Sequence, residues 1–116
     1  MKTDLPQRTR RFALDVIRYC AGLPREQAFQ VIGRQLVRSA TSVGANYRAA
    51  CRARSRADFV NKLGIVEEEA DETSYWLELL AELQPGRSKE LGRLCDEAGQ
   101  LTAIVVASRK TARKRK

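Results

Sequence analysis

The segment RADFVNKLGIVEEEADETSYWLELLAEL, residues 56–83, decides the fold of this chain. Its apolar and small side chains recur every three or four residues, the spacing that places them on one face of an α-helix. Ser55 precedes the segment and Asp58 follows three residues later, a pair typical of a helix N-terminus. The segment therefore predicts a helix over residues 56–83. Its buried face would comprise Phe59, Leu63, Val66, Ala70, Thr73, Leu77 and Leu80.

The same spacing continues on both sides of that segment. It predicts further helices over residues 7–21, 25–53 and 88–109, and the three prolines all fall at helix boundaries. No segment alternates with the two-residue period of a β-strand. Because the connections between the helices are short, sequential helices must run antiparallel. We therefore predict an all-α chain, folded as an antiparallel up-down-up-down four-helix bundle.

The length of 116 residues favours one domain. We expect residues 1–107 to form the bundle. Residues 108–116, SRKTARKRK, carry six positive charges and no negative charge, so we expect a basic tail that frays or is disordered.

The composition narrows the class of protein. The chain has 22 basic and 14 acidic residues, a net charge of +8, which favours an anionic partner such as RNA, DNA or a membrane surface. No apolar stretch is long enough to span a bilayer, the N-terminus lacks the apolar core of a signal peptide, and we expect no membrane role. Three cysteines far apart predict reduced thiols, and we expect a cytoplasmic protein.

Charge is divided between two neighbouring predicted helices. Residues 25–56 have a net charge of +6, whereas residues 57–84 have a net charge of −7. Arg34, Arg38, Arg48 and Arg52 fall on one outward stripe of the first of these helices. Two interpretations remain open: the stripe meets carboxylates of its own chain or of another copy, or it follows the phosphates of a nucleic acid.

The helix over 56–83 carries a second apolar stripe away from its core face. A helix that is apolar on two sides usually packs on two sides, so we expect a homo-oligomer. Small side chains on the preceding helix would let another helix approach closely. The predicted interface comprises Ser42, Ala45, Ala49, Ile65, Glu68, Glu72, Trp76, Leu79 and Leu83.

The residues that usually perform catalysis are not found in a productive pattern. Histidine is absent, and the only dense carboxylate cluster, EEEADE at 67–72, lies on one helix, so we expect no metal, no cofactor and no catalytic site. Ser39, Thr41 and Ser42 have no base beside them in the sequence, and such hydroxyls often bond helix carbonyls. Gly33, Gly44 and Gly64 lie inside predicted helices and suggest close helix contacts.

The aromatic residues give no sign of a reader of single-stranded sequence. Tyr19, Tyr47, Tyr75 and Trp76 do not cluster with arginine as a base-stacking platform would. We therefore do not expect sequence-specific readout.

The stretches QLVRSATSVGANY, RARSRADFVNKL and EEEADETSYWLELL resemble a known bacterial family. The family comprises four-helix bundle proteins encoded in the intervening sequences of 23S ribosomal RNA genes, and the resemblance covers residues 12–106. It implies a ring, a homopentamer, and a similarity to the basic accessory variability proteins of diversity-generating retroelements, which partner a reverse transcriptase and nucleic acid. No catalytic residues are implied. Many members have glutamate three residues after the position of Asn46, where this chain has Ala49, so a role that needs that acid is in doubt here.

These observations lead to a principal hypothesis and an alternative. The first is a non-enzymatic, oligomeric adaptor that binds structured RNA or DNA through phosphates and assists a reverse transcriptase. The alternative is a homo-oligomeric protein-interaction scaffold without a nucleic-acid role. The residues predicted to bind nucleic acid are Arg8, Arg10, Arg11, Arg34, Arg38, Arg48, Arg52, Arg109, Lys110, Arg113, Lys114, Arg115 and Lys116.

Overall fold

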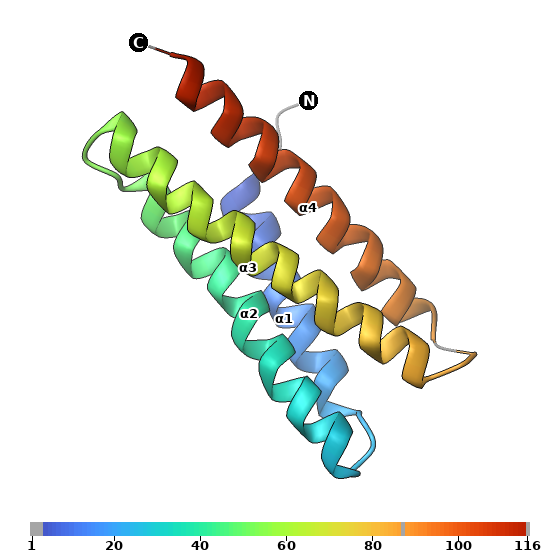
Figure 1. Cartoon of the computed structure of the whole chain (residues 1–116). Helices are drawn as coiled ribbons and strands as arrows, with labels where there is room; N and C mark the ends of the chain where they lie inside the picture. The colour runs from blue at the N-terminus through green and yellow to red at the C-terminus, as the bar shows by residue number, and fades with distance from the viewer. Residues whose placement is uncertain (1–3, 87, 116) are drawn as a thin grey trace.

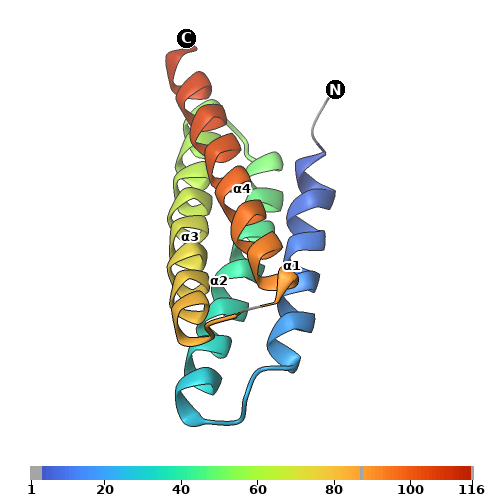
Figure 2. The ribbon, with the colours of Figure 1, turned by 90° about the vertical axis from the view of Figure 1, so that its right-hand side faces the viewer.

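The structure, a computed structural model, describes residues 4–86 and 88–115, which form four α-helices and no strand (Figure 1). In chain order the helices are α1 (Leu5–Ala21), α2 (Gln27–Cys51), α3 (Arg56–Leu83) and α4 (Lys89–Lys114). Consecutive helices run in opposite directions along a bundle about 50 Å long (Figure 2). The predicted antiparallel up-down-up-down bundle is confirmed.

Side-chain caps begin three of the helices. Ser55 Oγ accepts a hydrogen bond from the backbone N–H of Asp58, at 3.1 Å, so α3 begins where the sequence predicts. Ser88 Oγ accepts from the N–H of Leu91, at 3.2 Å, and Asp4 accepts from that of Gln7, at 3.3 Å. Each cap satisfies a backbone donor that the first turn of a helix leaves without a partner.

Several helix ends differ from the predicted ones, and the largest difference is at the end of α4. α1 starts at Leu5 rather than residue 7. α2 is shorter than predicted at both ends, starting at Gln27 rather than residue 25 and ending at Cys51 rather than 53. α4 ends at Lys114, whereas we predicted an end at residue 109 followed by a frayed or disordered tail. Packing explains the longer helix, because Ala112 is buried and the Arg56 guanidinium donates to the carbonyl oxygen of Arg115. Lys116 lies outside the described residues.

The predicted core face of α3 is confirmed. Its six members from Leu63 to Leu80 are buried, and Phe59 is half-buried. The polar member, Thr73, is satisfied at the α2–α3 seam, because its hydroxyl lies 2.9 Å from Ser39 Oγ and 2.8 Å from the carbonyl oxygen of Glu69. Ser39 in turn donates to the carbonyl oxygen of Leu36, as expected for a helix hydroxyl.

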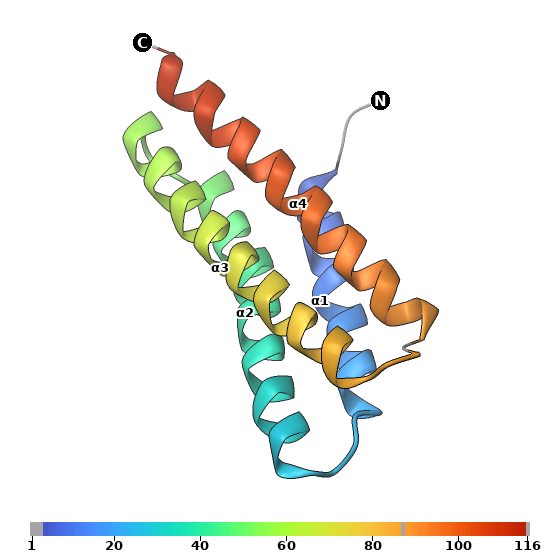
Figure 3. The same cartoon turned by 45° about the vertical axis from the view of Figure 1, so that its right-hand side comes forward.

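The topology brings distant parts of the chain to one end of the bundle. The start of α1, the turn from α2 to α3 and the end of α4 lie together, as Figures 1 and 2 show. Figure 3 shows the last turns of α4 beside the start of α3. α1 and α4 meet least among the four adjacent helix pairs.

Candidate nucleic-acid interface

Positive charge gathers at the end of the bundle where these segments meet. One small internal space in the bundle marks a boundary between its two ends. The side chains that line this space form a layer across the bundle; they are Phe12, Val43, Ala70, Thr73, Ala98 and Leu101. On the side of this layer that holds both chain termini, residues 4–12, 44–70 and 101–115 carry thirteen basic and five acidic side chains, a net charge of +8. Described residues on the other side carry six basic and nine acidic side chains, a net charge of −3. We call the first side the basic end.

The predicted arginine stripe of α2 is exposed along its whole length, but its members have different partners. Arg38 Nη1 lies 3.3 Å from Glu69 Oε1, and its Nη2 donates to Glu72. The indole N–H of Trp76 also donates to Glu72, at 3.0 Å. These bonds hold the pKa of the Glu72 carboxyl below its ordinary value, the Trp76 bond contributing most and Arg38 next. Arg38 therefore belongs to the seam between α2 and α3.

The other three arginines of the stripe are available. Within residues 4–86 and 88–115, no carboxylate lies within ion-pairing distance of Arg34, Arg48 or Arg52. Arg48 and Arg52 lie at the basic end, whereas Arg34 lies on the other side of the dividing layer. Of the two interpretations of the stripe, pairing with the same chain thus accounts for one arginine of the four.

Arg8 and Arg109, like Arg38, make contacts that join two helices of the bundle. The Arg8 guanidinium makes two hydrogen bonds to the Glu97 carboxylate, at 2.7 and 2.8 Å, and a third to Gln100, at 2.7 Å. Arg109 is half-buried; its Nε donates to the carbonyl oxygen of Val60 at 3.2 Å, and its Nη1 lies 3.6 Å from Glu67. These contacts tie α1 to α4 and α3 to α4.

The remaining predicted basic residues have side chains with no hydrogen-bond or ion-pair partner in the described part of the chain. They are Arg10, Arg11, Lys110, Arg113, Lys114 and, through its side chain, Arg115. Two further exposed arginines that our prediction did not include lie at the same end, Arg54 in the α2–α3 turn and Arg56 at the start of α3. The antiparallel order of the helices could have revealed them, because it places that turn beside both chain termini.

The residues predicted for an oligomer interface are divided between exposed and internal positions. Ala45, Ile65, Glu68 and Leu83 are exposed, and Ile65 and Leu83 have 43% and 50% of their surface accessible. Trp76 and Leu79 are half-buried and pack against the core of their own chain, and Glu72 is bonded to Arg38. Ser42 and Ala49 are half-buried on α2.

Two other kinds of site are not formed by the described residues. No group of three or more Cys, Asp or Glu side chains there could hold a metal ion. No helix in that part of the chain is long and apolar enough to cross a membrane.

Comparison with known proteins finds a family and a solved structure. The family described as 23S rRNA-intervening sequence protein matches residues 1–107. A crystal structure of a protein of unknown function from the S23 ribosomal protein family, from Bacteroides thetaiotaomicron VPI-5482, is 35% identical to this chain. The match covers 91% of this chain and 98% of the other, with a TM-score of 0.83. No curated protein matches.

Proposed function

This chain belongs to the 23S rRNA-intervening sequence protein family, and from that premise we propose that it is a non-enzymatic, oligomeric adaptor that binds structured RNA or DNA through phosphates. The family carries no established activity to transfer. The proposal therefore depends on the surface of this chain.

One observation carries the proposal: basic side chains that have no ion-pair partner among the described residues converge from three separate segments at the basic end. Arg10 and Arg11 come from α1, Arg48 and Arg52 from the end of α2 and the residue that caps it, and Lys110 from α4. A protein gains affinity for nucleic acid by replacing counterions of the phosphates with its own cations, and several cations on one surface can do so together. Contacts of this kind position a protein on a nucleic acid without reading its sequence.

Arg48, in the last turn of α2, and Arg52, directly after that helix, are the ordered part of this surface, because the end of α2 fixes their positions. The cations at the end of α4 and the start of α1 extend it. The resemblance to accessory variability proteins suggests a reverse transcriptase as the protein partner.

The test is the affinity for a structured RNA and for a DNA duplex across a salt series. Replacing Arg48 and Arg52 with alanine should lower the slope of log affinity against log salt by about one for each phosphate that is no longer neutralised. Arg38→Ala is the matched control, since it removes an exposed arginine of the same stripe that already has carboxylate partners. Equal effects of Arg38→Ala and Arg48→Ala, or no salt-dependent binding at all, would contradict the proposal.

Cations at the end of α4 are best tested by substitution rather than by truncation. A chain that stops at residue 107 would lack the buried Ala112 and the bonds of Arg109 as well as the charges. A triple change of Lys110, Arg113 and Lys114 to alanine keeps the helix and should weaken binding to all sequences alike. Selective weakening of binding to one sequence would argue against phosphate contacts.

A second candidate function, a homo-oligomeric protein-interaction scaffold, is favoured by the outer face of α3. That face exposes Ile65, Tyr75 and Leu83, with 43%, 53% and 50% of their surfaces accessible, beside Glu68. Apolar side chains of this size are often covered by a partner. Under this alternative, Glu68→Lys should dissociate the oligomer in sedimentation analysis while nucleic-acid affinity is unchanged or raised. An intact assembly would count against it.

A further inference from the structure

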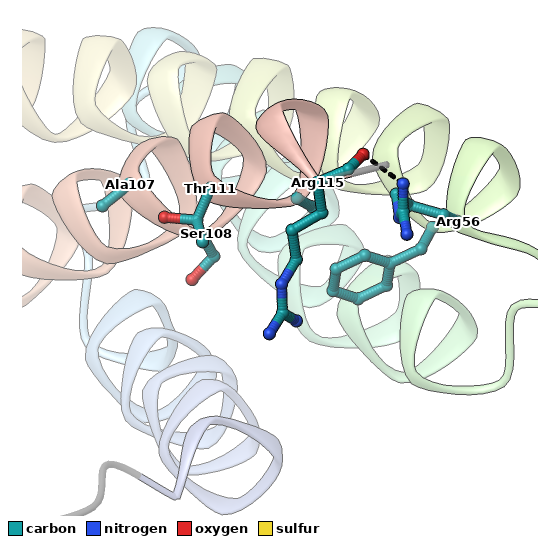
Figure 4. A pocket seen from close by; sticks show the side chains of 7 residues that line it. Arg56, Ala107, Ser108, Thr111 and Arg115 are labelled. Carbon is teal, nitrogen blue, oxygen red and sulfur yellow. Dashed lines mark hydrogen bonds between the residues drawn. The ribbon is translucent and has the colours of Figure 1, made fainter.

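A groove lies at the basic end, between the start of α3 and the end of α4 (Figure 4). Its volume of about 570 Å³ is within the range of small-molecule sites. Its apolar lining is one aromatic ring and two alanines, and the rest of its lining carries hydroxyls and guanidinium groups. The lining comprises Arg56, Phe59, Ala107, Ser108, Thr111, Ala112 and Arg115.

The threonine hydroxyl of the groove lacks the bond that the other threonines of the described residues make. Thr9, Thr41, Thr73 and Thr102 each donate to the carbonyl oxygen four residues earlier. Thr111 is the one threonine of the described residues that makes no such bond, and neither its hydroxyl nor that of Ser108 has a partner in that part of the chain. Figure 4 shows both side chains near the α4 edge of the groove. They are therefore free to bond a ligand.

The charge of the groove comes from side chains. The positive end of the α3 dipole and the negative end of the α4 dipole both lie beside it, so their fields offset one another. Arg56 donates to the carbonyl oxygen of Arg115, which holds the two helix ends together and leaves most of its N–H donors unused. The Arg115 side chain extends separately along the groove, as Figure 4 shows. Two arginines beside an aromatic ring favour a ligand that is both flat and anionic.

We propose that this groove holds one unpaired nucleotide of a bound nucleic acid, with its base on Phe59 and its phosphate near Arg56 and Arg115. The inference rests on the proposed function and adds to it the recognition of a single-stranded position. Stacking on an aromatic ring tolerates every base, because each base has a π-face. The groove therefore adds affinity for an unpaired nucleotide without adding sequence specificity.

The test compares a blunt RNA duplex with the same duplex carrying a short single-stranded overhang. The full chain should bind the overhang duplex about tenfold more tightly, the scale of one stacked base. Phe59→Leu keeps an apolar side chain but removes the ring, so it should abolish this preference while leaving affinity for the blunt duplex unchanged. Ala107→Leu, which fills the groove from an exposed position, should do the same if Phe59→Leu impairs folding.

Thr111→Val provides a finer comparison, since it removes only the unbonded hydroxyl. It should reduce the overhang preference, whereas Thr102→Val, which removes a hydroxyl already bonded within α4, should not. An equal affinity for both duplexes, or a preference that survives both Phe59→Leu and Ala107→Leu, would overturn the groove assignment and leave the phosphate-binding proposal standing. Failure to bind either duplex would instead overturn both.

Overhangs made of DNA and of RNA test whether the groove depends on the sugar of the nucleotide. We expect the preference to appear with both, because stacking on Phe59 and contacts to a phosphate do not depend on the sugar. A last control adds inorganic phosphate or adenosine 5′-monophosphate as a competitor of the overhang duplex. If the two competed equally strongly, the groove would bind an anion only, and the role of Phe59 would be overturned.

Discussion

The guanidinium of Arg109 lies directly against Gly64, in the first half of α3. A Cβ atom at residue 64 would stand 3.0 Å from Arg109 Nη2 and 3.1 Å from its Cζ, closer than most real Cβ contacts. The glycine therefore makes room for the arginine to reach the carbonyl oxygen of Val60 and the Glu67 carboxylate. This contact explains why position 64 is a glycine, although glycine destabilises the interior of a helix.

A double-mutant cycle measures this contact. Arg109→Ala should lower the free energy of unfolding by about 1–2 kcal/mol, because it removes a charge-assisted hydrogen bond and the packing of the side chain. In that background Gly64→Ala should restore about 1 kcal/mol through helix propensity. With Arg109 present, the same change should restore less or destabilise, since the guanidinium must move. Urea denaturation measures all four variants.

The control for this cycle is Lys110→Ala, which removes an exposed cation one residue further on. It should leave the unfolding free energy within about 0.5 kcal/mol of the wild type. Independent, additive effects of the Gly64 and Arg109 substitutions would mean that the two residues do not interact.

The bond between Trp76 and Glu72 makes the only tryptophan of the chain a reporter of one carboxylate. Because the pKa of Glu72 is lower in the folded chain, its ionised form contributes stability at neutral pH, and that contribution is lost as the pH falls through the lowered value. We expect the tryptophan fluorescence to change in acid with a midpoint below the ordinary glutamate pKa of about 4.3. Arg38→Ala should raise this midpoint.

Arg34→Ala serves as the matched control for that titration, since Arg34 is exposed on the same stripe and lies beyond ion-pairing distance of Glu72. Its midpoint should equal that of the wild type. A midpoint that is insensitive to Arg38→Ala would show that the ion pair does not form in solution.

The cysteines should differ in reactivity although none is in a disulfide. Burial raises the pKa of the Cys20 thiol to about 11, whereas Cys51 is exposed at the end of α2. Because the thiolate is the reactive form, iodoacetamide at pH 8 should label Cys20 about tenfold or more slowly than Cys51. Peptide mass spectrometry over time measures both rates, and Cys51→Ser should remove the fast phase. Similar rates at the two sites would contradict the buried position of Cys20.

The helices and the buried face of α3 could be predicted from the sequence because both depend on local spacing. The end of α4 could not, since its last turns are stabilised by Arg56 and by the burial of Ala112, contacts that depend on the neighbouring helix. A glycine inside α3 pointed to a close contact, but nothing in the sequence identified Arg109 as the group that makes it.

The candidate site was predictable only as a list of cations. Arg34 and Arg38 are four residues apart on one exposed stripe, yet only Arg38 meets carboxylates of the described residues, because the register of α2 against α3 places Glu69 and Glu72 beside it. That register is set by side-chain packing across the seam, which the sequence pattern of one helix does not determine. The bonds of Arg8 to Glu97 could not be predicted for the same reason, since Glu97 lies on α4.

The separation of charge along the bundle affects how the protein is oriented as it approaches a polyanion. A body about 50 Å long with opposite net charge on its two halves has a large permanent dipole moment along its axis. The field of a polyanion exerts a torque on such a body at a distance of about one Debye length, roughly 10 Å at 0.1 M salt. Random tumbling would then be biased, and collisions would be end-first more often than side-on. Encounter rates at low salt would rise accordingly, while two copies of the chain in dilute buffer would attract pole to pole.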